Sequence, residues 1–148
     1  MVDVSHKPPS LRRAIAESRV SMTREALTRL LRAEVPKGDV LATARLAGIM
    51  AAKRTSEIIP LCHPIALTHV SVELRVEESA SAVTVGATVE ALDRTGVEME
   101  ALVAVSTAAL TIYDMMKSLD RSMIIGPTRL VFKSGGRSGQ YPPEGSSA

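Results

Sequence analysis

The chain has 148 residues, of which 45% are hydrophobic and 23% are charged, and its net charge at pH 7 is +2. This composition is typical of a single soluble globular domain, and so small a net charge argues against a nucleic-acid-binding protein. Aromatic residues make up only 2% of the chain, which also argues against a platform that stacks the bases of a single strand.

The cellular compartment can be predicted from the cysteine content and the N-terminal sequence. Cys62 is the only cysteine, which excludes an intramolecular disulfide and favours a reducing compartment. The first residues contain no basic region followed by an apolar core, so we expect no secretory signal. No apolar run approaches the roughly 18 residues needed to cross a bilayer. We therefore expect a cytoplasmic protein that has no membrane partner.

The N-terminal half of the sequence predicts an arm, one strand and two helices. Residues 1–10 are rich in proline and are expected to be extended. Residues 11–22 mix apolar and polar positions and are read as a strand. Thr23 is a suitable N-cap for a short helix over 24–32. An alanine-rich stretch predicts a second helix over 40–56, and prolines follow it.

The C-terminal half predicts a hairpin, a long helix and a last strand. Residues 65–76 alternate between apolar and polar, and 83–92 do the same after a short turn, which indicates a β-hairpin. Residues 97–119 predict a helix that is apolar nearly all round, so we expect it to be buried on several sides. A larger core or a subunit interface would supply that burial. Residues 122–132 predict a strand, and the glycine-rich segment 134–148 a flexible tail.

These elements define the expected fold class. The order is β-α-α-β-β-α-β over a single domain of residues 1–148. If the first short helix is set aside, this is the ferredoxin-like βαββαβ arrangement. We therefore predict an α+β fold in which an antiparallel sheet carries its helices on one face.

Asp114 and Lys117 lie among the apolar residues Ile112, Met115 and Met116. A spacing of three residues on a helix places the carboxylate and the amine on one face, one turn apart. Apolar surroundings would make each group perturb the proton affinity of the other, which is how acid–base chemistry is prepared. The alternative is an exposed helical salt bridge worth a few tenths of a kcal/mol.

Cys62 and His63 are adjacent in a segment bracketed by Pro60 and Pro64. Neighbouring loop residues do not hydrogen-bond automatically, so a catalytic Cys–His dyad is a weak hypothesis and a buried structural cysteine is the default. His63 is held by the proline that follows it, and a functional and a structural role are both open. The three histidines and one cysteine show no metal-ligand spacing, so we predict no metal site.

Glu98 and Glu100 lie at the start of the long helix predicted from residue 97. They can be explained by favourable interaction with the helix dipole. Glu100 and Asp114 are fourteen residues apart, which places them within about 40° of one face but about 21 Å apart along the helix axis. One helix cannot bring both to one reacting centre. Either one of them is catalytic, or a symmetry-related chain supplies the other end of the site.

Residues 133–139 combine glycines with two cations and are similar to an anion cradle, although they lack the order of a phosphate loop. A loose tail is the alternative explanation. Other cations could join this segment in a basic site for a polyphosphate, or could form an ordinary solvated surface. They are Arg12, Arg13, Lys37, Lys53 and Arg54.

Three motifs together resemble the molybdenum-cofactor biosynthesis protein C family, the cyclic pyranopterin monophosphate synthases. They are Ile-Pro-Leu-Cys-His-Pro-Ile at 59–65, Gly-Val-Glu-Met-Glu-Ala at 96–101 and Thr-Ile-Tyr-Asp-Met-x-Lys at 111–117. Segments 37–45 and 133–136 match as well. The resemblance covers about residues 1–139. Met116 and Arg137 depart from it, because relatives often carry Cys and Lys there, but neither position is assigned to catalysis.

The resemblance implies a ferredoxin-like homohexamer, a trimer of dimers with active sites at the dimer interfaces. It implies conversion of 3′,8-cyclo-7,8-dihydroguanosine 5′-triphosphate to cyclic pyranopterin monophosphate, with release of diphosphate. No tightly bound cofactor is implied, and Mg²⁺ can accompany the triphosphate. Asp114 and Lys117 match the catalytic residues of the family. The positions that match the substrate pocket are Leu61, Cys62, His63, Met99, Glu100, Glu98, Lys37, Lys133 and Arg12.

Two other functions remain as rivals at this point. The first is a nucleotide cyclase or phosphotransferase that uses the same basic residues on ordinary GTP. The second is a ferredoxin-like binding module for RNA or for a regulatory ligand. The shortage of aromatic residues argues against RNA.

Overall fold

The computed structural model describes residues 1–137 and 139–142. Its elements are β1 (Ser10–Ser21), α1 (Arg24–Leu31), α2 (Val40–Ala52), α3 (Thr55–Ile58), β2 (Leu67–Glu77), the 3₁₀ turn η1 (Glu78–Ala80), β3 (Ala82–Asp93), α4 (Glu98–Met116), β4 (Ile124–Ile125) and β5 (Arg129–Ser134). Over these residues the strands form one antiparallel sheet in the order β2-β3-β1-β4, and β5 also pairs with β1. The predicted ferredoxin-like α+β class is confirmed.

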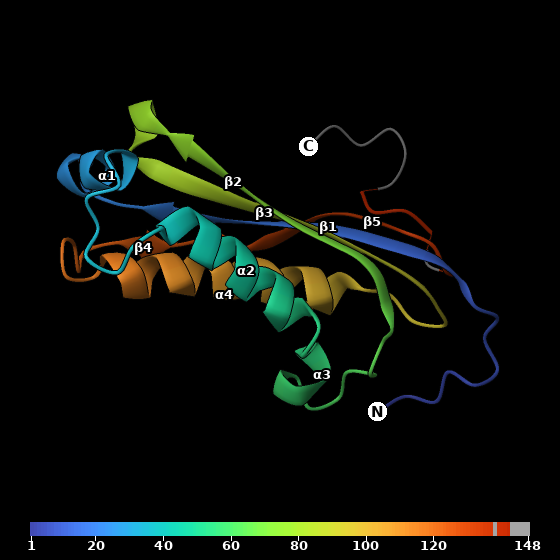
Figure 1. The fold of residues 1–148 in the computed structure, drawn as a ribbon. Coiled ribbons are helices and arrows are strands. Elements are labelled where there is room, and N and C mark those ends of the chain that lie inside the picture. Colours follow the sequence, from blue (N-terminus) through green and yellow to red (C-terminus); the bar gives the residue numbers. More distant parts are fainter. Residues whose placement is uncertain (138, 143–148) are drawn as a thin grey trace.

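Helices α2 and α4 lie side by side beneath one face of the sheet (Figure 1). The inward faces of β1 and β3 carry small side chains such as Ala14, Ala16 and Ala87, which are fully or almost fully buried. Small residues let the helix backbone approach the sheet closely, and α4 also has small buried residues, Ala104 and Ala108. The core is therefore a tight contact between an alanine- and valine-rich sheet and an alanine-rich helix.

The predicted helix over 40–56 is wrong at its C-terminal end. Helix α2 stops at Ala52, and a separate short helix, α3, begins at Thr55. The Thr55 side chain is buried, and its hydroxyl donates to the backbone carbonyl of Ala52 at 3.0 Å. This hydrogen bond satisfies a carbonyl at the helix end, where the chain turns toward the proline-rich loop.

The predicted last strand is interrupted. Pro127 has no N–H to give to the sheet, and Gly126 has a φ of +130°, so the ladder with β1 breaks between β4 and β5. Part of the segment 134–148, expected to be a flexible tail, is instead joined to β5. Tyr141 and Lys133 exchange two backbone hydrogen bonds of 2.9 Å. Residues 138 and 143–148 of the expected tail lie outside the described residues.

Helix α4 is buried by the sheet and by α2, but not all round. Leu110 is 59% exposed, so one side of the helix remains open in the single chain. By length and composition alone, α4 is long and apolar enough to cross a bilayer, a test that a mostly buried core helix also passes. Its apolar character is accounted for by residues such as Ala101, Val105 and Ile112, which are completely buried in the core.

Gly48 of α2 sets the distance between α2 and α4. A Cβ at this position would lie 2.9 Å from the Ala104 carbonyl oxygen and 3.2 Å from a methyl group of Val72. We predict that Gly48→Val lowers the free energy of unfolding by about 2 kcal/mol through overpacking. The exposed position Ala42, also on α2, provides the control, because Ala42→Val should cost only the difference in helix propensity, less than about 1 kcal/mol. Urea unfolding of both variants measures this, and equal losses would contradict the packing argument.

Candidate active site

The C-terminal end of α4 holds a cluster of three charged side chains, which we call the lysine–aspartate triad: Lys37, Asp114 and Lys117. The Lys117 ammonium lies 2.7 Å from Asp114 Oδ1, and the Lys37 ammonium lies 2.6 Å from Oδ2. Lys37 also donates to the Asp114 backbone carbonyl at 3.0 Å. Hydrogen bonds from Lys117 and then Lys37 lower the pKa of Asp114 to about 2, so this carboxylate is ionised throughout the physiological range.

The triad is not shielded within its own chain. The side chains of Lys37, Asp114 and Lys117 are 47%, 53% and 52% exposed. The expectation that apolar neighbours keep the pair out of water is wrong for the single chain. Ile112 and Met116 point into the core, whereas residues 114 and 117 lie on the open side of the helix. The pairing of Asp114 with Lys117 is confirmed, and sequence spacing alone did not indicate that Lys37 joins them.

A second site, the His63 cavity, lies between the loop after α3 and the start of α4. Its volume is about 270 Å³. It contains each of the residues that the motifs at 59–65 and 96–101 placed in a substrate pocket. Its lining is Leu61, Cys62, His63, Ile65, Thr95, Gly96, Glu98, Met99 and Glu100. Two segments more than thirty residues apart in sequence are therefore brought together here.

Glu100 is the buried ionisable group of the His63 cavity. Glu100 is only 3% exposed, and its Oε2 has no hydrogen-bond partner among the residues that the structure describes. Burial raises the pKa of Glu100 to about 7, and the nearby carboxylates of Glu98 and Asp93 act in the same direction. At neutral pH the side chain is thus divided between an acid that can donate and a carboxylate that can accept. A ligand in this cavity could donate a hydrogen bond to Oε2, for which the described part of the chain offers no partner.

Cys62 does not have the properties of a nucleophile. Partial burial and then the charge of Glu100 raise the pKa of its thiol, which favours the unreactive protonated form. The neighbouring His63 instead places Nε2 2.8 Å from the Val2 carbonyl oxygen of the N-terminal arm. The geometry therefore gives no support to a Cys–His dyad and leaves both side chains as walls of the cavity.

A third site, the basic cavity, opens beside the His63 cavity and has a volume of about 620 Å³. Among the described residues its lining carries six cationic side chains and one carboxylate. The lining comprises Lys7, Pro8, Ser10, Arg12, Arg13, Arg94, Thr95, Gly96, Val97, Glu98, Lys133, Ser134, Gly135, Gly136 and Arg137. A concave surface with this balance of charge attracts anions, and a chain of phosphate groups carries the charge that would match it.

The two cavities are neighbours, because Thr95, Gly96 and Glu98 line both. Lys133 and Arg12 are both in the basic cavity, and Lys133 lies 3.6 Å from Glu98. The segment expected to act as an anion cradle is in place there, with φ values of +96° at Gly135 and +76° at Gly136.

Not every predicted cation belongs to the basic cavity. Lys37 is in the triad, and Lys53 lines a different hollow beside Thr55 and Ser56. Sequence reasoning did not assign Arg94 or Lys7 to the site. For Arg94 a signal existed, since it lies two residues before the Gly-Val-Glu-Met-Glu motif, whereas nothing in the sequence connects Lys7 with this cavity.

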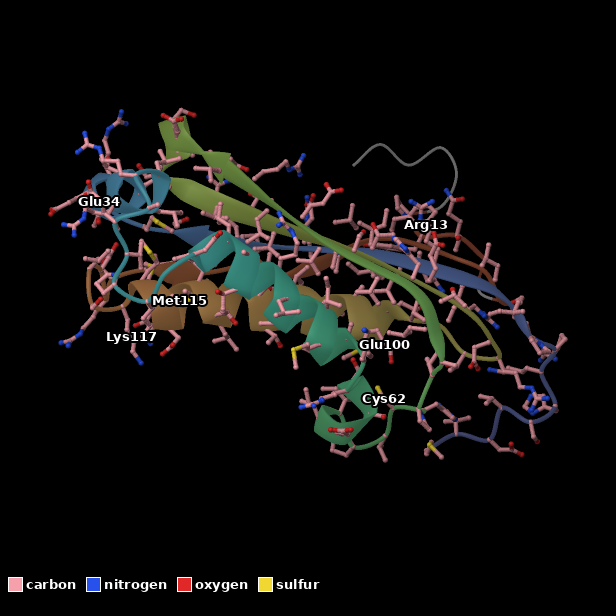
Figure 2. All side chains as sticks on the ribbon, viewed as in Figure 1. Arg13, Glu34, Cys62, Glu100, Met115 and Lys117 are labelled. Carbon is pink, nitrogen blue, oxygen red and sulfur yellow. The ribbon has the colours of Figure 1, made fainter. Side chains whose placement is uncertain are left out.

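The triad and the two cavities lie toward opposite ends of α4. In Figure 2, Lys117 is at one end of the helix, while Glu100 is at the other, with Cys62 nearby. Fourteen residues separate Asp114 from Glu100, which corresponds to about 21 Å along a straight helix. Within one chain, the structure does not bring the predicted catalytic residues to the predicted substrate-binding residues.

The protein has an α+β fold, and its basic cavity has the shape and charge of a binding site for a small anionic molecule. The family model described as the MoaC family matches residues 1–136. The chain belongs to the MoaC family, whose enzymes are lyases of molybdenum-cofactor biosynthesis.

Curated relatives match over nearly the whole chain. A protein of Roseiflexus sp. (strain RS-1) is 60% identical over 141 residues, which cover 95% of this chain and 89% of the relative. A protein of Pelobacter propionicus is 54% identical, covering 97% of this chain and 90% of the relative. One of Thermomicrobium roseum is 53% identical, covering 100% and 89%. Each of these relatives is named cyclic pyranopterin monophosphate synthase.

The raised pKa of Glu100 makes a prediction about stability. The folded state holds the proton more tightly than the unfolded state, so stability due to this group is present below pH 4.5 and is lost as the pH rises to about 7. Between pH 4.5 and pH 7 the free energy of unfolding of the wild type should therefore fall by roughly 3 kcal/mol relative to that of Glu100→Gln, which has no such group. Urea unfolding at pH 4.5 and pH 8 tests it. Glu73→Gln, at an exposed carboxylate on β2, is the control for the change of charge, and an identical pH profile for wild type and Glu100→Gln would contradict the assignment.

Proposed function

We propose that this enzyme is a cyclic pyranopterin monophosphate synthase that converts 3′,8-cyclo-7,8-dihydroguanosine 5′-triphosphate to cyclic pyranopterin monophosphate and diphosphate. The observation that carries the proposal is the adjacency of two cavities of different character. A pocket rich in cations meets a pocket with a buried acid along the shared residues Thr95, Gly96 and Glu98. The substrate has the same two parts, a triphosphate and a polar heterocycle.

The basic cavity binds the triphosphate in this proposal. Lys133 and Arg12 are largely buried in its wall, so their charges are less screened than those of surface lysines. Positive charge at this position also stabilises the diphosphate as it leaves. Glu100 and His63 hold the heterocycle, Glu100 through the oxygen that lacks a partner and His63 by orienting a ribose hydroxyl or a phosphate.

The proton transfers are assigned to the lysine–aspartate triad. The purine's five-membered ring opens and is rebuilt, and a sugar hydroxyl attacks the α-phosphorus as the bond to diphosphate breaks. Lys117 exchanges the protons of these steps. Because the pKa of Asp114 is lowered to about 2, this residue acts as a permanent anion that orients Lys117 and Lys37. The sequence motif alone had suggested that both members of the pair exchange protons.

The complete active site is proposed to form between two chains of a homo-oligomer, a hexamer built as a trimer of dimers. The separation of about 21 Å between Asp114 and Glu100 supports this, since one substrate cannot react at two centres that far apart. The half-exposed triad supports it as well, because a partner chain could cover it. Leu46 and Met50 on α2 and Leu110 on α4 are exposed apolar side chains that an interface would bury.

We propose that the enzyme has no resident cofactor and that any Mg²⁺ taking part arrives with the triphosphate. In the residues that the structure describes, no group of three or more His, Cys, Asp or Glu side chains could hold a metal ion. We also place the enzyme in the cytoplasm, where a free thiol such as Cys62 persists and nucleotide triphosphates are available.

The roles of the triad predict a large loss of activity in single variants. Asp114→Ala and Lys117→Ala should each lower kcat by about 100-fold or more, because each removes a group needed for proton transfer. Diphosphate release from the cyclised nucleotide, with mass analysis of the product, measures this. Glu34→Ala is the control, because Glu34 belongs to another exposed ion pair, with Arg29, and should leave the rate unchanged. Near wild-type rates in either triad variant, or equal diphosphate release from ordinary GTP, would refute the proposal.

The shared site predicts complementation between inactive variants. In a mixed dimer of Asp114→Ala and Glu100→Gln chains, one site carries both changes and the other carries neither. Random exchange of subunits should therefore restore up to about a quarter of the wild-type activity per chain. Mixing under conditions that allow exchange, followed by the diphosphate assay, tests this. A mixture as inactive as its two components, although exchange is demonstrated by mass, would place each site within one chain.

A further inference from the structure

Arg12 occupies an unusual place for a cation. It lies on the inward row of β1, which it shares with Ala14 and Ala16, and it is only 8% exposed. The inward-facing residues of β1 face α4 and continue beyond the residue at which that helix begins, Glu98. Arg12 is therefore a largely buried cation near this end of the sheet, and it lines the basic cavity.

The guanidinium of Arg12 is held on one side by the turn between β3 and α4. Its Nε donates to the Asp93 carbonyl oxygen and its Nη2 to the Arg94 carbonyl oxygen, both at 3.1 Å. The two bonds use the fixed fork of the guanidinium, a geometry that a lysine ammonium cannot reproduce. Arg94, Thr95 and Gly96 of the same turn then line the basic cavity.

A second turn, at Gly135 and Gly136, also lies close to the guanidinium. Gly135 and Gly136 both have positive φ, and a Cβ on Gly136 would clash with Nη1 of Arg12. A Cβ on Gly135 would clash with the Leu11 carbonyl oxygen. At Gly135 a side chain would meet backbone, so glycine is required there for steric reasons as well as for backbone conformation. At Gly136 a methyl group would meet only the Arg12 guanidinium, which would have to move. Two turns that both line the basic cavity therefore contact the same side chain, that of Arg12.

The charge of Arg12 has no anionic partner among the described residues, since both of its acceptors are neutral backbone carbonyls. A buried cation without a counter-charge is costly, and an anion in the adjoining cavity would offset that cost. Two of its five N–H groups are committed to the β3–α4 turn. The other three N–H groups are not used by these two bonds, so the side chain can hold the turn and still offer donors and charge to an anion.

We propose that Arg12 is a positioning residue that fixes the distance between the β3–α4 turn and the Gly135–Gly136 turn, and that the basic cavity binds a polyphosphate only while this clamp is in place. The inference rests on the proposed function for the identity of the anion. It deepens that function by giving Arg12 a geometric task that charge alone cannot perform.

Arg12→Lys separates the effect of charge from the effect of geometry. It keeps the positive charge and removes the paired N–H groups that bond the β3–α4 turn. Titration calorimetry with inorganic triphosphate is the measurement. We expect Kd to rise roughly tenfold to a hundredfold in both Arg12→Lys and Arg12→Ala, as for loss of charge-assisted hydrogen bonds. Free guanidinium at millimolar concentration should recover much of the binding of Arg12→Ala. Wild-type affinity in Arg12→Lys, or no recovery with guanidinium in a folded Arg12→Ala protein, would overturn the proposal.

The glycines provide a second test, which does not alter Arg12. Gly136→Ala should weaken triphosphate binding about as much as Arg12→Ala, because the new methyl group displaces the guanidinium. Gly139→Ala is the matched control, since Gly139 also has a positive φ, +63°, but has open space around it. It should bind triphosphate like the wild type. The double variant Arg12→Ala/Gly136→Ala should bind triphosphate only slightly more weakly than Arg12→Ala alone. If the losses of binding free energy of the two single changes simply add in the double variant, the clamp is contradicted.

These outcomes are distinct from a failure of the proposed function. If the wild type binds inorganic triphosphate through the clamp but does not convert the cyclised nucleotide, the proposed reaction fails and the clamp stands. If the wild type converts the nucleotide and Arg12→Lys binds triphosphate normally, the clamp alone fails.

Discussion

The close contact between α4 and the sheet is the constraint on which the rest of the structure depends. Small, buried alanine side chains on both the sheet and α4 let the helix backbone approach the sheet closely, and Gly48 allows an equally close approach of α2 to α4. A helix packed this tightly acts as a rigid rod. Its two ends then hold their groups at a fixed separation, with Glu100 in a cavity at one end and Asp114 at the surface of the other.

Different surroundings give the two carboxylates of α4 opposite properties, burial acting on Glu100 and hydrogen bonds from two lysines on Asp114. Glu100 is enclosed, lacks a partner for one oxygen and has a pKa of about 7. Asp114 is open to solvent and bound by two ammonium groups, and its pKa is about 2. One helix therefore presents a group that can change its charge near neutral pH and another that keeps its charge. The environment, rather than the residue type, separates the two roles.

Much of the fold could be predicted from the sequence, because its strongest signals are local. The alternation in β2 and β3, the Thr23 cap and the apolar length of α4 each reflect a short stretch of chain. The break of α2 before Thr55 is accompanied by hydrogen bonds from the Thr55 hydroxyl to the carbonyls of Ala51 and Ala52, and the break between β4 and β5 falls at Gly126 and Pro127. The pairing of Lys37 with Asp114 joins residues 77 positions apart, so no periodicity could indicate it. The exposure of Asp114 depends on which side of α4 the sheet covers, and the apolar neighbours in sequence lie on the other side.

Lys37 has a consequence that extends beyond its charge. It bonds both the side chain and the main-chain oxygen of Asp114, so it joins the segment before α2 to the last turn of α4. The acidic side chain is thereby kept from rotating freely even though water reaches it. A molecule arriving at this surface meets groups already arranged for it, and little conformational entropy has to be given up on contact. Preorganisation at this end of the helix is thus a property of the isolated chain.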